Sequence, residues 1–228
     1  MTVETKYQCR YCKKEFSKET TLSAHLCEQK RRHQERGETG VQFGLKAYLK
    51  FYEYTQGSAR LKDWDQFAES PYYKAFVKFG RYCQSIRAIN PLRFMDWLLK
   101  HNKKIDFWCQ DTNYTEYLKE YLRVEAVDDA LSRAIEYSIT WGEKNSAQPH
   151  DCLRYGNRNL LCHAITTGHI SPWVIYNCNS GQEFLNELTA EQVAIIWAYI
   201  DTDVWQRKFA NYQSDQEYAK HILETAGW

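Results

Sequence analysis

Two cysteines and one histidine near the N-terminus are spaced as ligands of a single metal ion, and this spacing constrains the fold more than any other feature. The segment reads Cys9-x2-Cys12, followed by Phe16, Leu22 and His25. Two apolar side chains make a core too small to fold in so short a segment unless a metal holds it together. The spacing therefore predicts a short hairpin that carries the cysteine pair, followed by a helix that presents the histidine.

These five residues resemble the C2H2 zinc-finger family, at the first three ligands and at both core positions. The resemblance implies a ββα fold and Zn²⁺ as the bound metal. The fourth ligand departs from the family pattern, because neither His nor Cys stands three to five residues after His25. Cys27 follows after one residue, and His33 would lie about 12 Å further along a continuous helix. We expect Cys27 to be the fourth ligand, with local unwinding of the helix end, and His33 is the alternative.

The finger also has features of a nucleic-acid-binding segment. Aligned on the family, its base-facing positions are Lys18, Thr21 and Ala24. A single finger reads about three base pairs, too few for specificity alone. A basic run suited to phosphates follows: Lys30, Arg31, Arg32 and Arg36. A solvated helix end, or a finger that binds protein, is the alternative interpretation.

From Val41 onward the chain has the pattern of an all-α domain. Only 4 Pro and 10 Gly interrupt 228 residues, and N-cap residues precede several apolar periodic segments. Ser70, Asn90 and Ser171 each precede a proline, while Thr189 and Ser214 each begin a capping box. The expected helices are 41–55, 63–69, 71–86, 91–102, 113–123, 126–143, 158–167, 171–178, 190–200, 202–211 and 215–226. We predict two domains, a zinc finger with a basic helix tail over 1–36 and an all-helical domain over 41–228.

One predicted helix of this domain interleaves aromatic and basic residues. The aromatic residues are Tyr72, Tyr73, Phe76, Phe79 and Tyr82, and the basic ones are Lys74, Lys78, Arg81 and Arg87. Such a face suits the backbone and bases of single-stranded or forked DNA. An ordinary helix with a solvated basic face explains the pattern as well.

A segment near residues 150–173 invites a catalytic hypothesis. It gathers His150, Arg154, Arg158 and His169 around predicted loops, which often carry chemistry. However, the chain shows no nucleophile motif and no phosphate-binding glycine loop, and Asn157 is explained as a helix cap. A DNA-modifying enzyme with a pocket in this region is therefore an alternative to a binding protein.

The helical domain resembles the helicase-loading proteins of T-even phages. The similar stretches are YYKAFVKFGRY, LLKHNKKIDFWCQD, YTEYLKEYL, TTGHISPWVIY and SDQEYAKHILETA. The resemblance covers most of the domain but not the finger. It implies an all-helical protein of two subdomains that binds forked or single-stranded DNA and recruits a partner.

Charge and cysteine usage limit the remaining classes. The net charge of +1 gives no global nucleic-acid signature, so binding must rest on a local patch. No signal peptide or membrane span is recognisable, and the scattered cysteines indicate buried thiols in a reducing, intracellular setting such as a host cytoplasm. We therefore expect a phage-type DNA-binding accessory protein in replication or transcription, with a helicase or polymerase as its partner. A module that binds only a host or phage polymerase is a further alternative.

Overall fold

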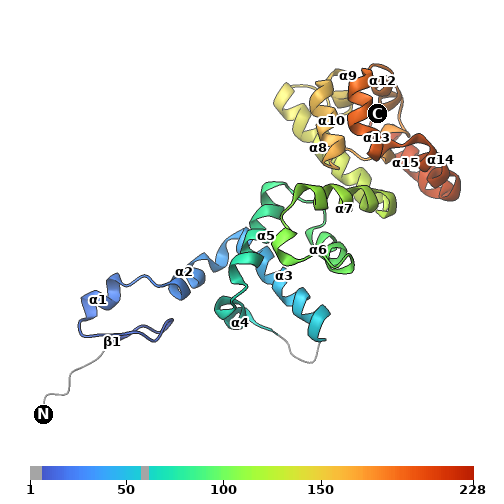
Figure 1. Cartoon of the computed structure of the whole chain (residues 1–228). Coiled ribbons are helices and arrows are strands. Elements are labelled where there is room, and N and C mark those ends of the chain that lie inside the picture. The colour runs from blue at the N-terminus through green and yellow to red at the C-terminus, as the bar shows by residue number, and fades with distance from the viewer. Residues whose placement is uncertain (1–6, 58–61) are drawn as a thin grey trace, which may run out of the picture. The chain divides into compact units, whose positions relative to one another are not determined.

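Helices make up nearly all of the regular structure in this computed structural model, which describes residues 7–57 and 62–228 (Figure 1). Within those residues the one sheet is a hairpin, in which β1 (Tyr7–Gln8) pairs antiparallel with β2 (Glu15–Phe16). The predicted all-α body with a small N-terminal ββα unit is confirmed. The chain forms two compact units, 1–113 and 114–228.

The first unit contains the hairpin and the helices of the first half of the chain. They are α1 (Glu19–Ala24), α2 (Glu28–Gln34), η1 (Glu35–Gly37), α3 (Thr39–Gln56), α4 (Trp64–Glu69), α5 (Tyr73–Ser85), α6 (Pro91–Lys100) and η2 (Ile105–Phe107). The long helix α7 (Asp111–Val124) begins in this unit and continues into the second. The basic helix tail expected up to residue 36 forms α2 and η1, and α3 begins soon after it at Thr39.

Helices α3 and α5 pack with their backbones in contact (Figure 1). A Cβ atom placed on Gly80 of α5 would lie 2.0 Å from the carbonyl oxygen of Gly40 and 2.6 Å from the amide of Gly44. Real Cβ atoms never approach backbone atoms this closely. The three glycines therefore permit the close crossing of α3 and α5.

The core of the first unit is built from aromatic rings around Trp108. Trp108 is fully buried and donates its indole N–H to the carbonyl oxygen of Lys103 over 2.9 Å. Its ring meets those of Phe51, Phe76 and Phe79 at edge-on angles, a favourable arrangement for aromatic pairs. Burial of these α5 rings corrects the prediction of a base-stacking face, because Phe76 and Phe79 are core residues.

The second unit consists of the remaining helices. After α7 they are α8 (Val127–Asn145), η3 (Pro149–Asp151), α9 (Cys152–Tyr155), α10 (Arg158–Thr166), α11 (Pro172–Ile175), α12 (Asn179–Asn186), α13 (Ala190–Ile200), α14 (Thr202–Asn211) and α15 (Gln213–Thr225). Trp173 and Trp205 are each 1% exposed. The ring of Trp173 meets those of Trp205 and Phe209 edge-on, and the rings of Trp205 and Phe209 are tilted by 44° to one another.

A buried ion pair also links elements of the second unit. Glu125, whose side chain is fully buried, pairs with Arg133 over 2.7 Å and accepts a hydrogen bond from the Ser171 hydroxyl. Arg133 also donates to the carbonyl oxygen of Gly168 over 2.6 Å. Burial raises the pKa of Glu125, because the effect of burial is larger than the opposing effects of Arg133 and Ser171.

Most of the predicted helix caps are confirmed. The side chains of Asn90, Asn157 and Ser171 accept backbone N–H groups at the starts of α6, α10 and α11. Thr189 and Gln192 form the predicted capping box of α13. Local sequence therefore sets where these helices begin.

Two predicted caps are wrong. Ser70 accepts the amide of Tyr72 over 3.1 Å within a turn, so α5 begins at Tyr73 rather than at Pro71. Helix α15 begins at Gln213, before Ser214, and its flanking residue makes no side-chain cap. At Ser70, a turn competes with the capping geometry that the sequence offers.

Candidate metal centre

Four side chains from the N-terminal hairpin and the segment after α1 converge in one cluster. Cys9, Cys12, His25 and Cys27 place one ligand atom each within 4.8 Å of the other three. The Cys9 and Cys27 sulfurs are 4.0 Å apart, and the Cys12 sulfur lies 3.2 Å from Nε2 of His25. The sequence predicted this set of four.

The turn between the strands brings the first two cysteines together. The amide of Cys9 donates to the carbonyl of Lys14 and the amide of Lys13 donates to Cys9, which closes the hairpin. Lys13 adopts a positive φ of 62° to make this turn. Phe16 lies beside the His25 ring, with centroids 4.7 Å apart, and so supports the third ligand.

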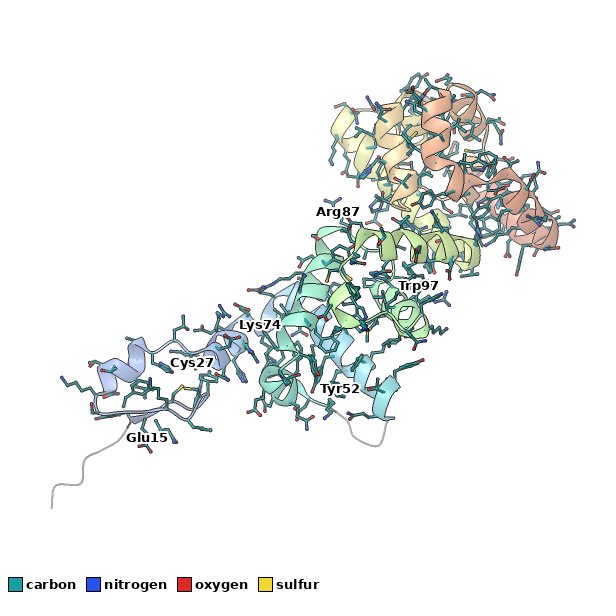
Figure 2. The ribbon with its side chains drawn as sticks, viewed as in Figure 1. Glu15, Cys27, Tyr52, Lys74, Arg87 and Trp97 are labelled. Atoms are coloured by element: carbon teal, nitrogen blue, oxygen red, sulfur yellow. The ribbon has the colours of Figure 1, made fainter. Side chains whose placement is uncertain are left out.

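A break in the helix places the fourth ligand. Helix α1 ends at Ala24, and His25 adopts an extended conformation. A second helix starts at Glu28 with Cys27 as its N-cap, whose sulfur accepts the amide of Lys30 over 3.4 Å. The predicted unwinding of the helix end is thus observed, and it brings Cys27 into the cluster. Figure 2 labels Cys27 in this segment between α1 and α2.

His33, the alternative fourth ligand, lies outside the cluster. Its Nδ1 accepts the indole N–H of Trp64 over 3.1 Å, and its ring packs 5.0 Å from that of Tyr11. The helix break turns α2 toward α4, so His33 reaches that helix instead of the metal ligands.

The electrostatics of the cluster suit a thiolate site. A backbone hydrogen bond from Cys12 outweighs burial and lowers the pKa of the Cys9 thiol to about 7. A backbone hydrogen bond from Lys14 also favours the Cys12 thiolate, but burial and the neighbouring thiols of Cys27 and Cys9 raise its pKa. Thiolates packed this closely need a cation between them.

Two cysteines outside the cluster, Cys83 and Cys152, differ from the cluster cysteines in their protonation. Burial raises the pKa of Cys83 to about 12 and that of Cys152 to about 11, so both stay protonated. They behave as small apolar core residues.

The donor set fits a tetrahedral zinc ion. Zinc binds sulfur at about 2.3 Å and imidazole nitrogen at about 2.0 Å, so ligand atoms around it are separated by roughly 3.5–3.8 Å. The separations of 3.2 and 4.0 Å in the cluster bracket that range. Three sulfurs and one nitrogen complete the coordination from protein side chains, which is typical of a structural site rather than a catalytic one.

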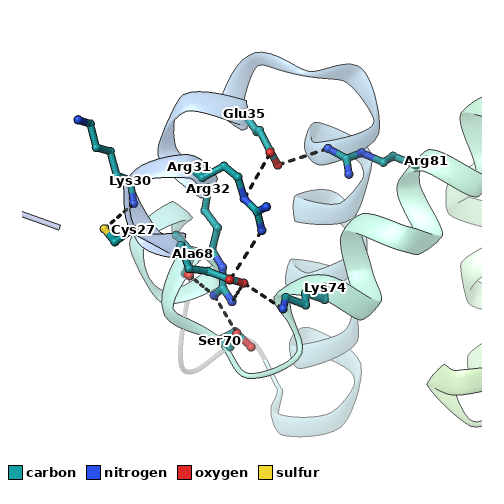
Figure 3. A network of polar contacts seen from close by, with 10 residues as sticks. Cys27, Lys30, Arg31, Arg32, Glu35, Ala68, Ser70, Lys74 and Arg81 are labelled. Carbon is teal, nitrogen blue, oxygen red and sulfur yellow. Dashed lines mark hydrogen bonds and ion pairs between the residues drawn. The ribbon is translucent and has the colours of Figure 1, made fainter. Parts of the chain in front are cut away.

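Helix α2 is fixed against the helical body by a set of charged contacts that we call the α2–α5 network (Figure 3). At its centre, the Glu28 carboxylate forms ion pairs with Arg32 at 2.9 Å and with Lys74 of α5 at 3.3 Å. A third, longer ion pair joins it to Arg31 at 3.7 Å. Hydrogen bonding from Arg32 and from Lys74 lowers the pKa of Glu28. Further along, Glu35 pairs with Arg31 and with Arg81, and Arg81 also pairs with Glu38 at 2.7 Å.

Arg32 makes the most buried contact of this network. Its guanidinium donates to the carbonyl oxygens of Ala68 at 2.6 Å and Ser70 at 3.4 Å, and it lies over the ring of Tyr73. Its side chain is only 12% exposed. Arg32 therefore caps the end of α4, and a contact between Arg32 and phosphates stays a prediction.

The other predicted phosphate-binding residues divide into two groups. Arg31, Lys74 and Arg81 are committed to the α2–α5 network, and the Arg36 guanidinium lies over the Trp64 ring. Lys78 is exposed beside the network, and Lys30 donates to the carbonyl oxygen of His25 over 3.1 Å.

A cationic surface lies on the hairpin, and of its four residues only Lys18 was predicted from the sequence. Arg10, Lys13, Lys14 and Lys18 are all exposed, and none of them makes an ion pair with another described residue. The signal was present as a basic residue on each side of Cys12, but it is weaker in sequence than the run at 30–32. We call these four residues the hairpin cations. Lys18 lies next to Thr21 and Ala24, which are exposed on α1 as the family resemblance implied.

The residues of the catalytic hypothesis each have a local partner. Arg154 pairs with Glu183 at 2.7 Å, and Arg158 pairs with Glu187 while donating to the carbonyl oxygens of Leu153 and Gly156. These contacts fix α9 and the start of α10 to α12.

The two histidines of that hypothesis lie on other elements. His150 is 4.0 Å from the carboxylate of its neighbour Asp151, and the His169 ring stacks on Tyr137 of α8. A catalytic role for residues 150–173 stays a hypothesis.

Among the described residues, no helix combines the length and the apolar character needed to cross a bilayer. Comparisons with protein-family models, with curated proteins and with solved structures give no match to this chain.

Proposed function

We propose that the chain is a DNA-binding accessory protein whose N-terminal segment is a structural zinc finger. Zinc would be held by Cys9, Cys12, His25 and Cys27, which leave no open coordination position for substrate. Its role is to fix the hairpin against α1 and to start α2, because the hairpin and α1 contain no buried apolar side chain other than Cys9.

The observation that carries the nucleic-acid part of the proposal is the set of hairpin cations. Four exposed cations within nine residues, without an acidic partner in the described chain, create a local positive potential on a nearly neutral protein. Phosphates are their natural counter-ions. By contrast, four basic residues of α2 and α5 already have carboxylate partners in the α2–α5 network: Arg31, Arg32, Lys74 and Arg81.

Exposed residues of α1 and its N-cap residue Lys18 are available for base contacts. Lys18 has the length and charge to reach a guanine edge, and Ala24 suits a thymine methyl group. A single finger covers about three base pairs, so the helical body or a partner must add affinity. The likeness of the body to phage helicase-loading proteins supports a role in replication or transcription, with a helicase or polymerase as the partner.

The experiment is a fluorescence-anisotropy titration of the zinc-loaded full chain with duplex, single-stranded and forked DNA at low salt. We expect binding that is lost when a chelator removes the metal. Lack of binding to all three DNAs would overturn the proposal and favour a finger that binds protein.

A further inference from the structure

A pocket of about 360 Å³ lies between α2 and α5 in the first unit. The buried side chains of Tyr73 and Val77 form its floor, and six charged side chains surround it. Four of the six are cations and two are carboxylates: Arg31, Lys74, Lys78 and Arg81, with Glu28 and Glu35. We call this cavity the α2–α5 pocket. Its volume is in the range of small-ligand sites.

The α2–α5 pocket carries a surplus of positive charge. Four cations against two carboxylates leave a net charge of +2. Two further charges pair with the pocket from outside it, Arg32 with Glu28 and Glu38 with Arg81, and these two cancel one another. Because the whole chain has a net charge of only +1, the surplus is a local feature that attracts anions.

Two of the four cations have no hydrogen-bond partner in the described part of the chain. Arg31 lies 3.7 Å from both Glu28 and Glu35, which is too long for a hydrogen bond, and its guanidinium bonds to no other described residue. Lys78 is exposed and makes no ion pair within residues 7–57 and 62–228. Both side chains therefore have N–H donors available for a ligand.

Arg81 completes the set of available donors from the opposite wall. It uses Nη2 for its contacts with Glu35 and Glu38, and its Nε and Nη1 bond to no described residue. Figure 3 shows Arg31 of α2 pointing toward Lys74 and Arg81 of α5. The donors of both helices thus converge on one pocket.

The floor of the pocket holds another unpaired polar group. Tyr73 is 4% exposed, and its hydroxyl has no hydrogen-bond partner among the described residues. A buried hydroxyl without a partner lowers stability. An unpaired hydroxyl below a ring of cations favours an occupant that accepts hydrogen bonds.

We propose that the α2–α5 pocket binds a phosphate dianion, either free inorganic phosphate or the terminal 5′-phosphate of a DNA strand. The planar guanidinium groups of Arg31 and Arg81 match the oxygens of a phosphate, and Lys78 adds a point charge. A terminal phosphate carries nearly two negative charges at neutral pH, which balances the surplus of +2, whereas a phosphodiester of the DNA backbone carries one. Glu28 and Glu35 keep their ion pairs and hold the cations around the pocket.

This site is separate from the hairpin cations, and it does not rest on the proposed DNA binding. Its ligand would bridge α2, which starts at the metal-type cluster, and α5 of the helical body. Binding should therefore also stabilise the contact between these two helices.

The test is isothermal titration calorimetry of the zinc-loaded full chain with inorganic phosphate, in chloride buffer of constant ionic strength near pH 7.5. We expect saturable binding at one site, with a dissociation constant of roughly 0.1–1 mM. Lys78→Gln should weaken it about fivefold, as expected for the loss of one exposed charge contact. Arg31→Gln should act in the same direction, and circular dichroism checks that both variants fold.

The matched control is Lys100→Gln on α6, an exposed lysine that does not line the pocket. It should bind phosphate like the wild type. Absence of saturable binding up to about 10 mM phosphate would overturn the inference. So would unchanged affinity in both Lys78→Gln and Arg31→Gln, or a loss in Lys100→Gln as large as that in Lys78→Gln.

A second arm identifies the source of the phosphate. One single-stranded oligonucleotide is titrated with a 5′-phosphate and with a 5′-hydroxyl. Tighter binding of the phosphorylated strand, lost in Lys78→Gln, assigns the pocket to a DNA end. Equal binding of the two strands, together with saturable inorganic phosphate, assigns it to free phosphate. If inorganic phosphate binds and neither strand does, the pocket stands and the proposed DNA binding fails.

Discussion

The sulfur of Cys27 accepts a hydrogen bond from the backbone amide of Lys30 over 3.4 Å. One atom thus belongs to the metal-type cluster and also caps the first turn of α2. Because α2 carries Glu28 and Arg32 into the α2–α5 network, the cap connects the finger to the helical body through a single helix.

The first prediction concerns the identity of the fourth ligand. Zinc-loaded protein should contain one zinc per chain, and Cys27→Ser should release it at least tenfold more readily to a competing chelator, because a hydroxyl replaces a thiolate. His33→Ala should leave zinc affinity nearly unchanged, since His33 bonds to Trp64 rather than lying in the cluster. Metal analysis during chelator titration measures both, and the reverse ranking would reassign the ligand.

The second prediction concerns the extent of metal-dependent order. Chelation should unfold the hairpin and α1 and loosen α2, whereas the helices from α3 onward pack into cores of their own. We expect hydrogen exchange of the full chain to accelerate within residues 7–36 and to change little beyond residue 41. If chelation removes most of the helical circular dichroism, the predicted domain boundary at 36–41 is wrong.

The third prediction separates two adjacent arginines. Arg32→Ala should lower the free energy of unfolding by about 1–3 kcal/mol, because it leaves the carbonyl oxygens of Ala68 and Ser70 without their donor. Arg31→Ala is the matched control, with a side chain 53% exposed and ion pairs of 3.7 Å, and should cost at most about 0.5 kcal/mol. Urea denaturation of the zinc-loaded variants gives both values, and equal costs would contradict the structural role of Arg32.

The fourth prediction concerns the salt dependence of DNA binding. If the four hairpin cations all contact phosphates, the logarithm of affinity should fall with the logarithm of salt concentration at a slope of roughly −3 to −4. Lys13→Gln combined with Lys14→Gln should flatten this slope by about two, with little dependence on DNA sequence. Arg31→Gln should change it less, since Glu28 and Glu35 already neutralise that charge. Anisotropy titrations at four or more salt concentrations measure the slopes, and a larger effect at Arg31 would return the phosphate contacts to α2.

The fifth prediction follows from the buried carboxyl of Glu125. Burial raises its pKa in the folded protein although Arg133 and Ser171 bond to it and Lys208 lies nearby. The folded state therefore holds this proton more tightly than the unfolded chain does. The stability that Glu125 contributes in this way is fully present below its pKa in the unfolded chain, about 4.5. This stability is lost as pH rises through the higher pKa that Glu125 has in the folded protein.

Glu125→Gln should remove this part of the pH dependence. The difference in unfolding free energy between wild type and Glu125→Gln should be most favourable to the wild type near pH 4 and should shrink as pH rises toward 7. Urea denaturation across that range measures the difference. A difference that instead grows with pH would show that the ion pair with Arg133 outweighs burial.

The sequence by itself determined the features that depend on neighbours along the chain. The spacing of Cys9, Cys12 and His25 and the nearby Cys27 specified the cluster, because a hairpin and one helix end are enough to bring those atoms together. Asn90 and Thr189 marked helix starts for the same reason, since a cap bonds to an amide two or three residues away. The scarcity of Pro and Gly indicated a helical body.

Only the tertiary structure decided which charges and rings face solvent. Arg32 reads as a phosphate ligand in sequence, but α4, some 36 residues further on, supplies the carbonyl oxygen that buries it. Phe76 reads as a stacking ring, but Trp108 covers it. Trp197 lies in an apolar helix that predicts burial, yet no element of the described chain covers its side of α13 enough to bury it. Burial and ion pairing depend on contacts between segments that are distant in the sequence. A local sequence pattern predicts that a helix forms, but not which elements pack on each of its sides.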